Sequence, residues 1–171
     1  GIMGGQGAPD PEEYPPVEGQ EIILAVHPYT RYLHMTTDLS TFPVLASVPV
    51  LSKPSVTDNG QLVLFVGTDY NPYAVSIDGS QFLQLDNQGM FYNIAISPDG
   101  TRLAATSNQQ DGMIYAIDMN NLDDVKTWSI YTPTTREDVQ SNMAYYADAL
   151  DWSLDNQNVL YDAYNVAWLQ S

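Results

Sequence analysis

The chain has 171 residues, enough for one domain with a sizeable core or for part of a larger repeat architecture. Its 21 acidic and 5 basic residues give a formal charge of -16, which disfavours nucleic acid and anionic membrane surfaces as partners. Cysteine is absent, which excludes disulfides and thiolate metal sites, and no apolar stretch approaches the roughly 20 residues that membrane insertion requires.

The first segment, residues 1–19, is rich in Gly, Pro and Glu and has little hydrophobic periodicity. Such a segment cannot bury enough apolar surface to offset the entropy lost on ordering it. We therefore predict an extended arm over residues 1–19, followed by a folded domain over residues 20–171.

From Glu21 onward, short runs rich in Val, Ile, Leu, Tyr and Thr are separated by Asn, Asp, Gly and Pro clusters, which is typical of strands and turns. In chain order, the predicted strands cover residues 22–26, 32–36, 42–48, 62–66, 73–77, 82–85, 93–96, 103–106, 113–117, 127–131, 149–152, 159–162 and 166–169. The run 62–66 is apolar at every position, so we expect sheets to cover it on both faces. The pattern predicts an all-β domain.

A short segment repeats along the chain, and its best copy contains Ser97-Pro98-Asp99-Gly100. In this tetrad Pro presets φ, Asp can bond to nearby backbone, and Gly accepts a positive φ, which together specify a tight turn between antiparallel strands. Residues 94–103 align without gaps on 24–33, and residues 95–102 align on 55–62, forty positions earlier. A fourth, weaker copy lies at residues 151–160. We therefore predict one hairpin unit in four copies.

This tetrad followed by a short strand resembles the blade signature of TolB-like and WD-repeat-like β-propellers, and the resemblance covers most of the chain after the arm. It implies a partial β-propeller of about three to four blades, each a sheet of antiparallel strands. The Trp-Asp dipeptide that closes WD-repeat blades is missing, which leaves the subfamily open.

The predicted ring is incomplete. The first blade has little room for a fourth strand after residues 42–48, and the last copy ends after a third strand at residues 166–169. Because an unclosed stack leaves strand edges open to pairing, we expect further blades of the same polypeptide or a protein partner to complete it.

An insertion interrupts the repeat: Gly100 and Asn156 are 56 residues apart, against forty for Gly60 and Gly100. Residues 133–146 hold the additional chain, and Thr134 to Glu137 has the form of a capping box. We predict one short helix in this insertion between blades.

No residues are expected to be catalytic, and no cofactor or metal is expected. His27 and His34 have no triad or metal cluster arranged around them in the sequence. Asp151, Ser153, Asp155 and Asp162 match part of a calcium-loop template, but Asp replaces the bidentate Glu and the same residues align as a propeller hairpin. For this segment a hairpin turn is favoured over a calcium site.

The propeller geometry implied by the resemblance brings two kinds of loop to one face: those between blades and those between second and third strands. The candidate binding residues on this face are Asp69, Tyr70, Asn71, Met90, Phe91, Tyr92, Asp111, Tyr145 and Tyr146. Aromatic rings with amides and carboxylates suit contact with a protein or a carbohydrate. The alternative is that these aromatics seal the joints between blades.

The sequence favours a non-catalytic recognition or assembly module, located outside the cytoplasm or within a large surface or virion assembly. The alternative is a fragment of a propeller enzyme, a hydrolase or lyase acting on polysaccharide. Two carboxylates facing each other across a central cleft would favour the enzyme, and scattered surface carboxylates would favour binding.

Overall fold

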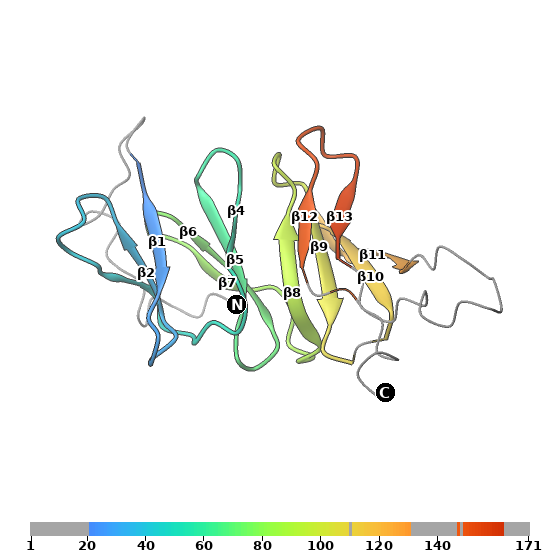
Figure 1. The fold of residues 1–171 in the computed structure, drawn as a ribbon, viewed down its shortest axis with the longest axis horizontal. Coiled ribbons are helices and arrows are strands. Elements are labelled where there is room, and N and C mark those ends of the chain that lie inside the picture. The colour runs from blue at the N-terminus through green and yellow to red at the C-terminus, as the bar shows by residue number, and fades with distance from the viewer. Residues whose placement is uncertain (1–20, 110, 131–146, 148, 163–171) are drawn as a thin grey trace. The chain divides into compact units, whose positions relative to one another are not determined.

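The computed structural model describes residues 21–109, 111–130, 147 and 149–162 (Figure 1). These residues form thirteen strands in four antiparallel sheets and contain no helix. The chain divides after Gly89 into two compact units, unit 1 with residues 1–89 and unit 2 with residues 90–171. The all-β prediction is confirmed, and each unit is described by itself.

Unit 1 contains two sheets. The first has the order β1-β2-β3, with β1 at Ile23–Val26, β2 at Leu33–Thr36 and β3 at Val44–Ala46. The second has the order β4-β5-β6-β7, with β4 at Ser55–Val56, β5 at Leu62–Val66, β6 at Pro72–Ser76 and β7 at Phe82–Gln84. Among the residues that the structure describes, the first blade has three strands, in line with the short blade predicted.

One apolar core joins the two sheets of unit 1. Three aromatic rings stack within it: the centroid of Tyr73 lies 5.5 Å from that of Phe65 and 5.6 Å from that of Phe82. Buried side chains from β2, β3, β5 and β6 complete this core. The four residues 63–66 of β5 are fully buried, which confirms the expectation that both faces of this strand are covered.

Unit 2 contains a four-stranded sheet with the order β11-β10-β9-β8 and a hairpin of β12 and β13. The strands are β8 at Phe91–Ile96, β9 at Arg102–Ser107, β10 at Met113–Asp118, β11 at Asn121–Ser129, β12 at Leu150–Trp152 and β13 at Val159–Tyr161. The hairpin packs on the sheet through Trp152, which lies in a buried cluster with Ala95 and Ala104.

Two hydrogen bonds tie the hairpin of unit 2 to the neighbouring sheet. The Trp152 indole Nε1–H donates to the Ala95 carbonyl at 2.8 Å in a buried position. The Asp99 backbone N–H donates to Asn156 Oδ1 at 2.9 Å, joining the tips of two hairpins. An aromatic residue thus supplies both the buried area and a partner for a buried carbonyl.

The repeated turn has the predicted geometry. The Asp99 carboxylate accepts from the Ser97 hydroxyl at 2.7 Å and from the Thr101 N–H at 3.0 Å, while Gly100 has a φ of 75°. The turns at Thr57-Asn59-Gly60 and Ser153-Asp155-Asn156 repeat this pattern. A further copy at Ser76-Asp78-Gly79 was not predicted.

The first copy of the repeat, residues 24–33, forms a turn at one end of its blade, whereas its alignment predicted a turn at the opposite end. Val50 donates its N–H to the Arg31 carbonyl at 2.8 Å and forms a β-bridge with Gly67, which begins the turn after β5. The turn between β1 and β2 therefore shares an end of unit 1 with the turn between β5 and β6. Its left-handed residue is Arg31, at a φ of 63°, and not the aligned Thr30.

The turn between β2 and β3 repeats the turn between β6 and β7 instead. Asp38 accepts from the Thr36 hydroxyl and the Ser40 N–H, as Asp78 accepts from Ser76 and Ser80 forty residues later. The strands β1, β2 and β3 thus correspond to the second, third and fourth strands of a blade. No further strand of this sheet follows β3 among the described residues, as predicted, but β3 takes the place of a fourth strand and not of the third that the alignment assigned to residues 42–48. The alignment was misleading because polar tight turns of similar sequence occur at both ends of a blade.

Two strand boundaries also differ from the prediction. β11 begins at Asn121, six residues before the predicted start, because its exposed polar residues show no apolar pattern and its ladder with β10 defines it. The short β4 was not among the predicted strands. The arm over residues 1–19, the helix in residues 133–146 and the strand at residues 166–169 lie outside the described residues.

Candidate binding turns

The turn between β5 and β6 is fixed by one carboxylate. Asp69 Oδ1 accepts from the Asn71 backbone N–H at 3.1 Å, and Oδ2 accepts from the Asn71 side-chain amide at 3.0 Å and from the Tyr73 hydroxyl. Between them Tyr70 adopts a left-handed φ of 62°. Asp69 and Asn71 therefore hold the backbone of the turn, while Tyr70 stays exposed at 38%.

The corresponding turn of unit 2, between β9 and β10, has the same arrangement, in which an aspartate accepts hydrogen bonds from the turn backbone and from a tyrosine hydroxyl of the next strand. We call each such aspartate–tyrosine pair a lock. Asp111 Oδ1 accepts from the Met113 N–H at 3.0 Å, and Oδ2 accepts from the Tyr115 hydroxyl. The common sequence is Asp-x-x-x-Tyr, present at Asp69 to Tyr73 and at Asp111 to Tyr115. Sequence reasoning had identified both acids but missed both tyrosines, although the recurring spacing was visible.

Both tyrosines remain protonated donors at neutral pH. Burial and the hydrogen bond to Asp69 raise the pKa of Tyr73 well above its usual range. The hydrogen bond to Asp111, together with burial, raises the pKa of Tyr115 to about 12. Each hydroxyl therefore stays available to donate its hydrogen bond to the turn carboxylate.

Connecting segments lie against these turns within each unit. In unit 1, Asn71 Oδ1 accepts from the Gly89 N–H at 2.7 Å, so the segment leaving β7 reaches the turn after β5. In unit 2, the Met90 carbonyl accepts from the Asn108 N–H at 3.0 Å, next to the turn that contains Asp111. Each unit therefore brings together the two kinds of loop that were predicted to share a face.

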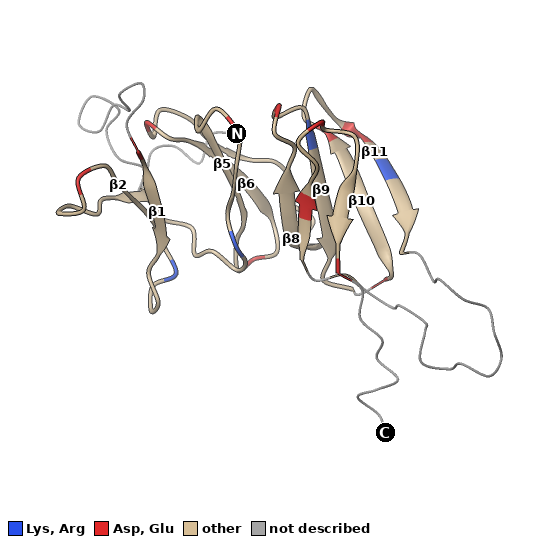
Figure 2. Cartoon of the chain, turned by 45° about the horizontal axis from the view of Figure 1, so that its top comes forward, with Lys and Arg blue, Asp and Glu red and all other residues tan. Residues whose placement is uncertain are grey.

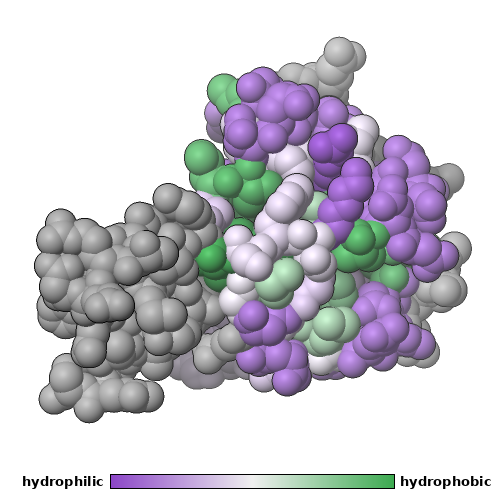
Figure 3. Space-filling model, turned by 90° about the vertical axis from the view of Figure 1, so that its right-hand side faces the viewer, coloured by the Kyte–Doolittle hydropathy of each residue, from purple (hydrophilic) through white to green (hydrophobic). Residues whose placement is uncertain are grey.

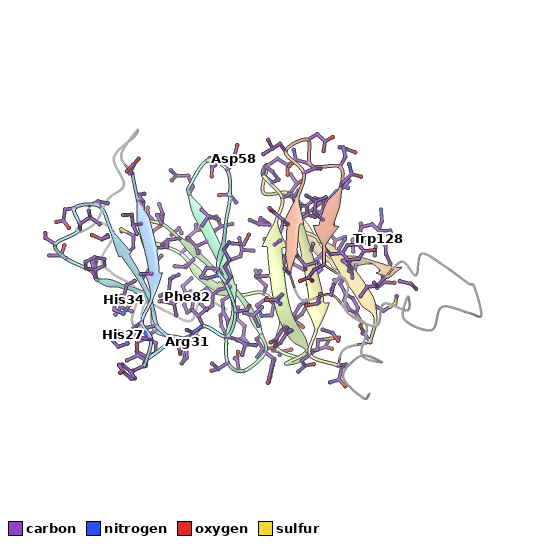
Figure 4. The ribbon with its side chains drawn as sticks, in the orientation of Figure 1. His27, Arg31, His34, Asp58, Phe82 and Trp128 are labelled. Carbon is purple, nitrogen blue, oxygen red and sulfur yellow. The ribbon has the colours of Figure 1, made fainter. Side chains whose placement is uncertain are left out.

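The turn between β1 and β2 lies at the same end of unit 1 as the turn between β5 and β6 and contributes further candidate residues. The sequence alignment had placed these residues at the opposite end of the blade. His27 Nδ1 accepts from the N–H groups of Tyr29 and Thr30 at 3.1 and 3.2 Å, which leaves the Tyr29 side chain 90% exposed. Arg31 Nε donates to the Val50 carbonyl at 3.1 Å. Figure 4 shows His27 and Arg31 at one end of unit 1 and Asp58 at the other. We call Tyr29, Arg31 and Tyr70 the turn surface.

The other predicted site residues differ in their secondary structure and in their exposure to solvent. Phe91 and Tyr92, expected in a loop between blades, are the first residues of β8, because Phe91 already pairs with Ser107. Phe91 is buried, Tyr92 is exposed and Met90 is half-buried. Tyr145 and Tyr146 lie outside the described residues.

The histidines and the calcium-like segment have structural contacts. His34 Nδ1 donates to the Phe42 carbonyl at 2.7 Å, and its ring centroid lies 5.9 Å from that of His27. Asp155 accepts from the Ser153 hydroxyl and the Gln157 N–H, as the hairpin interpretation predicts. Within the described ranges, no group of three or more His, Asp or Glu side chains is placed to hold a metal ion.

Acidic residues far outnumber basic ones, and those that Figure 2 colours red lie mostly in turns. Many of them accept local hydrogen bonds, as Asp38, Asp78 and Asp99 do, so the acidic composition partly reflects the number of turns. No helix in the part of the chain that the structure describes is long and apolar enough to cross a membrane.

Comparison with known proteins identifies the fold. No family model and no curated protein matches the sequence. Among solved structures, TolB from Acinetobacter baumannii matches with a TM-score of 0.56 and 17% identity over 83% of this chain and 37% of its own. The dihydro-heme d1 dehydrogenase NirN, in complex with DHE, matches with a TM-score of 0.56 and 14% identity over 83% of this chain and 30% of its own.

The fold is therefore that of a TolB-like β-propeller, as the repeated turn predicted. The chain spans about a third of the length of these solved structures. At such low identity the likeness concerns the fold alone, so function has to be argued from the residues of this chain.

Proposed function

We propose that this chain is a non-catalytic recognition or assembly module of a β-propeller, and that it binds a protein partner through the turn surface. The observation that carries the proposal is the contrast within the turn after β5: Asp69, Asn71 and Tyr73 fix the backbone, while Tyr70 is exposed. Tyr29 adds a second exposed ring at the same end of unit 1. Aromatic side chains on a preorganised backbone bind with little loss of conformational entropy.

Two acids of the hairpin turns have structural hydrogen bonds. Hydrogen bonds from the Thr101 N–H and the Ser97 hydroxyl hold the pKa of Asp99 below its usual range. The Ser153 hydroxyl and the Gln157 N–H do the same for the pKa of Asp155. These two carboxylates therefore stay charged and hold the hairpin turns, as scattered structural carboxylates do.

The module is proposed to function outside the cytoplasm or within a large surface or virion assembly. An excess of 21 acidic over 5 basic residues favours solubility in salty surroundings and discourages contact with nucleic acid. Further blades or a partner subunit are proposed to complete the ring, because a sheet edge that stays bare invites uncontrolled pairing.

Site-specific photo-cross-linking tests the turn surface. A benzoyl-phenylalanine is placed at Tyr29, at Tyr70 or at Asp58, which lies at the opposite end of β5, and the full chain is irradiated in an extract of its source. We expect the same cross-linked protein from positions 29 and 70 and none from position 58. Equal cross-linking at all three positions, or turnover of polysaccharide by the pure chain, would refute the proposal. Binding to a glycan array that depends on Tyr29 and Tyr70 would replace the protein partner by a carbohydrate.

A further inference from the structure

The outermost strand of the four-stranded sheet in unit 2 is unusually long. β11 has nine residues, whereas β3 and β7, which are the last strands of the two sheets in unit 1, have three each. Every residue of β11 is exposed. Short edge strands are a common protection against pairing with another chain, and β11 does not have that protection.

The register shows which backbone groups of β11 face away from β10. The Ile130 N–H donates to the Gly112 carbonyl at 2.9 Å, and in an antiparallel ladder bonded pairs alternate with non-bonded pairs. Ile114 with Trp128 and Ala116 with Lys126 are therefore the next bonded pairs. The N–H and C=O groups of Val125, Thr127 and Ser129 point outward.

The neighbouring ladder supports this alternation. The Met119 N–H donates to the Thr101 carbonyl at 2.9 Å, which makes Ile117 with Leu103 and Tyr115 with Ala105 bonded pairs. The odd residues of β10 therefore bond to β9, and its even residues bond to β11. The regular part of β11, residues 125–129, begins after the irregularity at Ile117 and Asp118.

The side chains around this edge are mixed in character. Trp128 is 49% exposed and lies opposite Ile114, and Asp123 and Asp124 precede the regular part of the strand. On the side of the molecule shown in Figure 3, apolar groups form small patches between hydrophilic ones. An occupant of this edge would therefore depend on backbone pairing and charge in addition to apolar contact.

We infer that β11 is a docking edge for an extended, basic segment of a partner protein, which adds a strand to the sheet of unit 2. The charge of -16 attracts a cationic segment and repels a second copy of this chain. A pairing of five residues also buries far less than the roughly 1,000 Å² expected of a stable dimer. This surface uses none of the turn-surface residues, so it can fail or succeed independently of the proposed function.

Hydrogen exchange with a synthetic strand tests the inference. The probe is an acetylated and amidated seven-residue peptide of alternating Lys and Val, added to the full chain at low salt. We expect the amides of Val125, Thr127 and Ser129 to exchange quickly in the free chain and at least tenfold more slowly with the peptide. The amides of Lys126 and Trp128, already bonded to β10, should be protected throughout.

A matched pair of variants separates strand pairing from simple charge attraction. Thr127→Pro removes one outward N–H and leaves the ladder with β10 intact, while Thr127→Ala keeps that N–H. We expect the proline variant to bind the peptide at least tenfold more weakly, and the alanine variant to bind it as the natural chain does. A peptide in which alternate residues are N-methylated should not bind, and neither should one with Glu in place of Lys.

Three outcomes would overturn the inference: outward amides already protected in the free chain, equal binding by both Thr127 variants, or protection at other strands. If the proline variant loses the protection of β10 amides, its fold is damaged, and the N-methylated peptide then decides the question alone. A Tyr70→Ser variant should bind the peptide normally, which distinguishes a failure here from a failure of the turn surface.

Discussion

The replacement Gly67→Ala is expected to disrupt the turn after β5. A Cβ at this position would lie 2.7 Å from Asp69 Oδ1, 2.9 Å from Tyr73 Cε2 and 3.0 Å from Val48 Cγ1. The Tyr73 ring cannot withdraw easily, because it stacks on Phe65 and Phe82. Overpacking costs about 1–3 kcal/mol and a weakened hydrogen bond about 1 kcal/mol more, so we expect a loss of about 2–4 kcal/mol.

Urea unfolding followed by far-ultraviolet circular dichroism measures this loss, and Gly60→Ala is the control. Gly60 has a φ of 70° and nothing within 4 Å of an added Cβ, so its replacement costs only the strain of a left-handed backbone, about 1 kcal/mol. If Gly67→Ala destabilised the chain no more than Gly60→Ala, the tight packing of Asp69 and Tyr73 around this glycine would be refuted.

Three further predictions concern the locks, the repeated turn and the hairpin of unit 2. The pKa of Tyr115 is about 12 in the folded chain and about 10 in an unfolded chain, so its contribution to the free energy of unfolding is complete below pH 10 and is lost as the pH rises toward 12. The urea midpoints at pH 9 and pH 11 should therefore differ more for the natural chain than for Tyr115→Phe. Equal differences would contradict the role of the hydrogen bond between Tyr115 and Asp111. Gly100→Val should cost about 1 kcal/mol or more, since Gly100 has a φ of 75°; an unchanged thermal midpoint would indicate a different turn geometry. Trp152→Phe leaves the Ala95 carbonyl without its indole donor and should cost about 2 kcal/mol; amide exchange in β8 that stays as slow as in the natural chain would exclude this role.

Features with a local cause could be predicted from the sequence. The turn at Ser97 to Gly100 is specified by its own residues, and the apolar run of β5 requires burial on both faces. The candidate acids Asp69 and Asp111 were placed correctly in turns between second and third strands. Their role was not evident, because the hydroxyl donors Tyr73 and Tyr115 belong to the following strands.

Features with a non-local cause could not be predicted in the same way. The position of β1 in its blade depends on contacts among Arg31, Val50 and Gly67, which no single turn sequence shows. Only the longer gapless alignment of residues 22–42 with 62–82, which pairs Asp38 with Asp78, contained that information. β11 has few apolar residues of its own, and its pairing with β10 extends it to Asn121.

The candidate surface rests on one architectural claim, that the turns after β1 and after β5 lie at the same end of unit 1. Nuclear Overhauser contacts in the isotopically labelled full chain test this most directly. We predict contacts from the Val50 amide to Arg31 and from Val50 to Gly67, as their hydrogen bond and bridge require. Contacts of the segment His27 to Tyr32 with Asp58 and Asn59, at the other end of β5, would contradict the account.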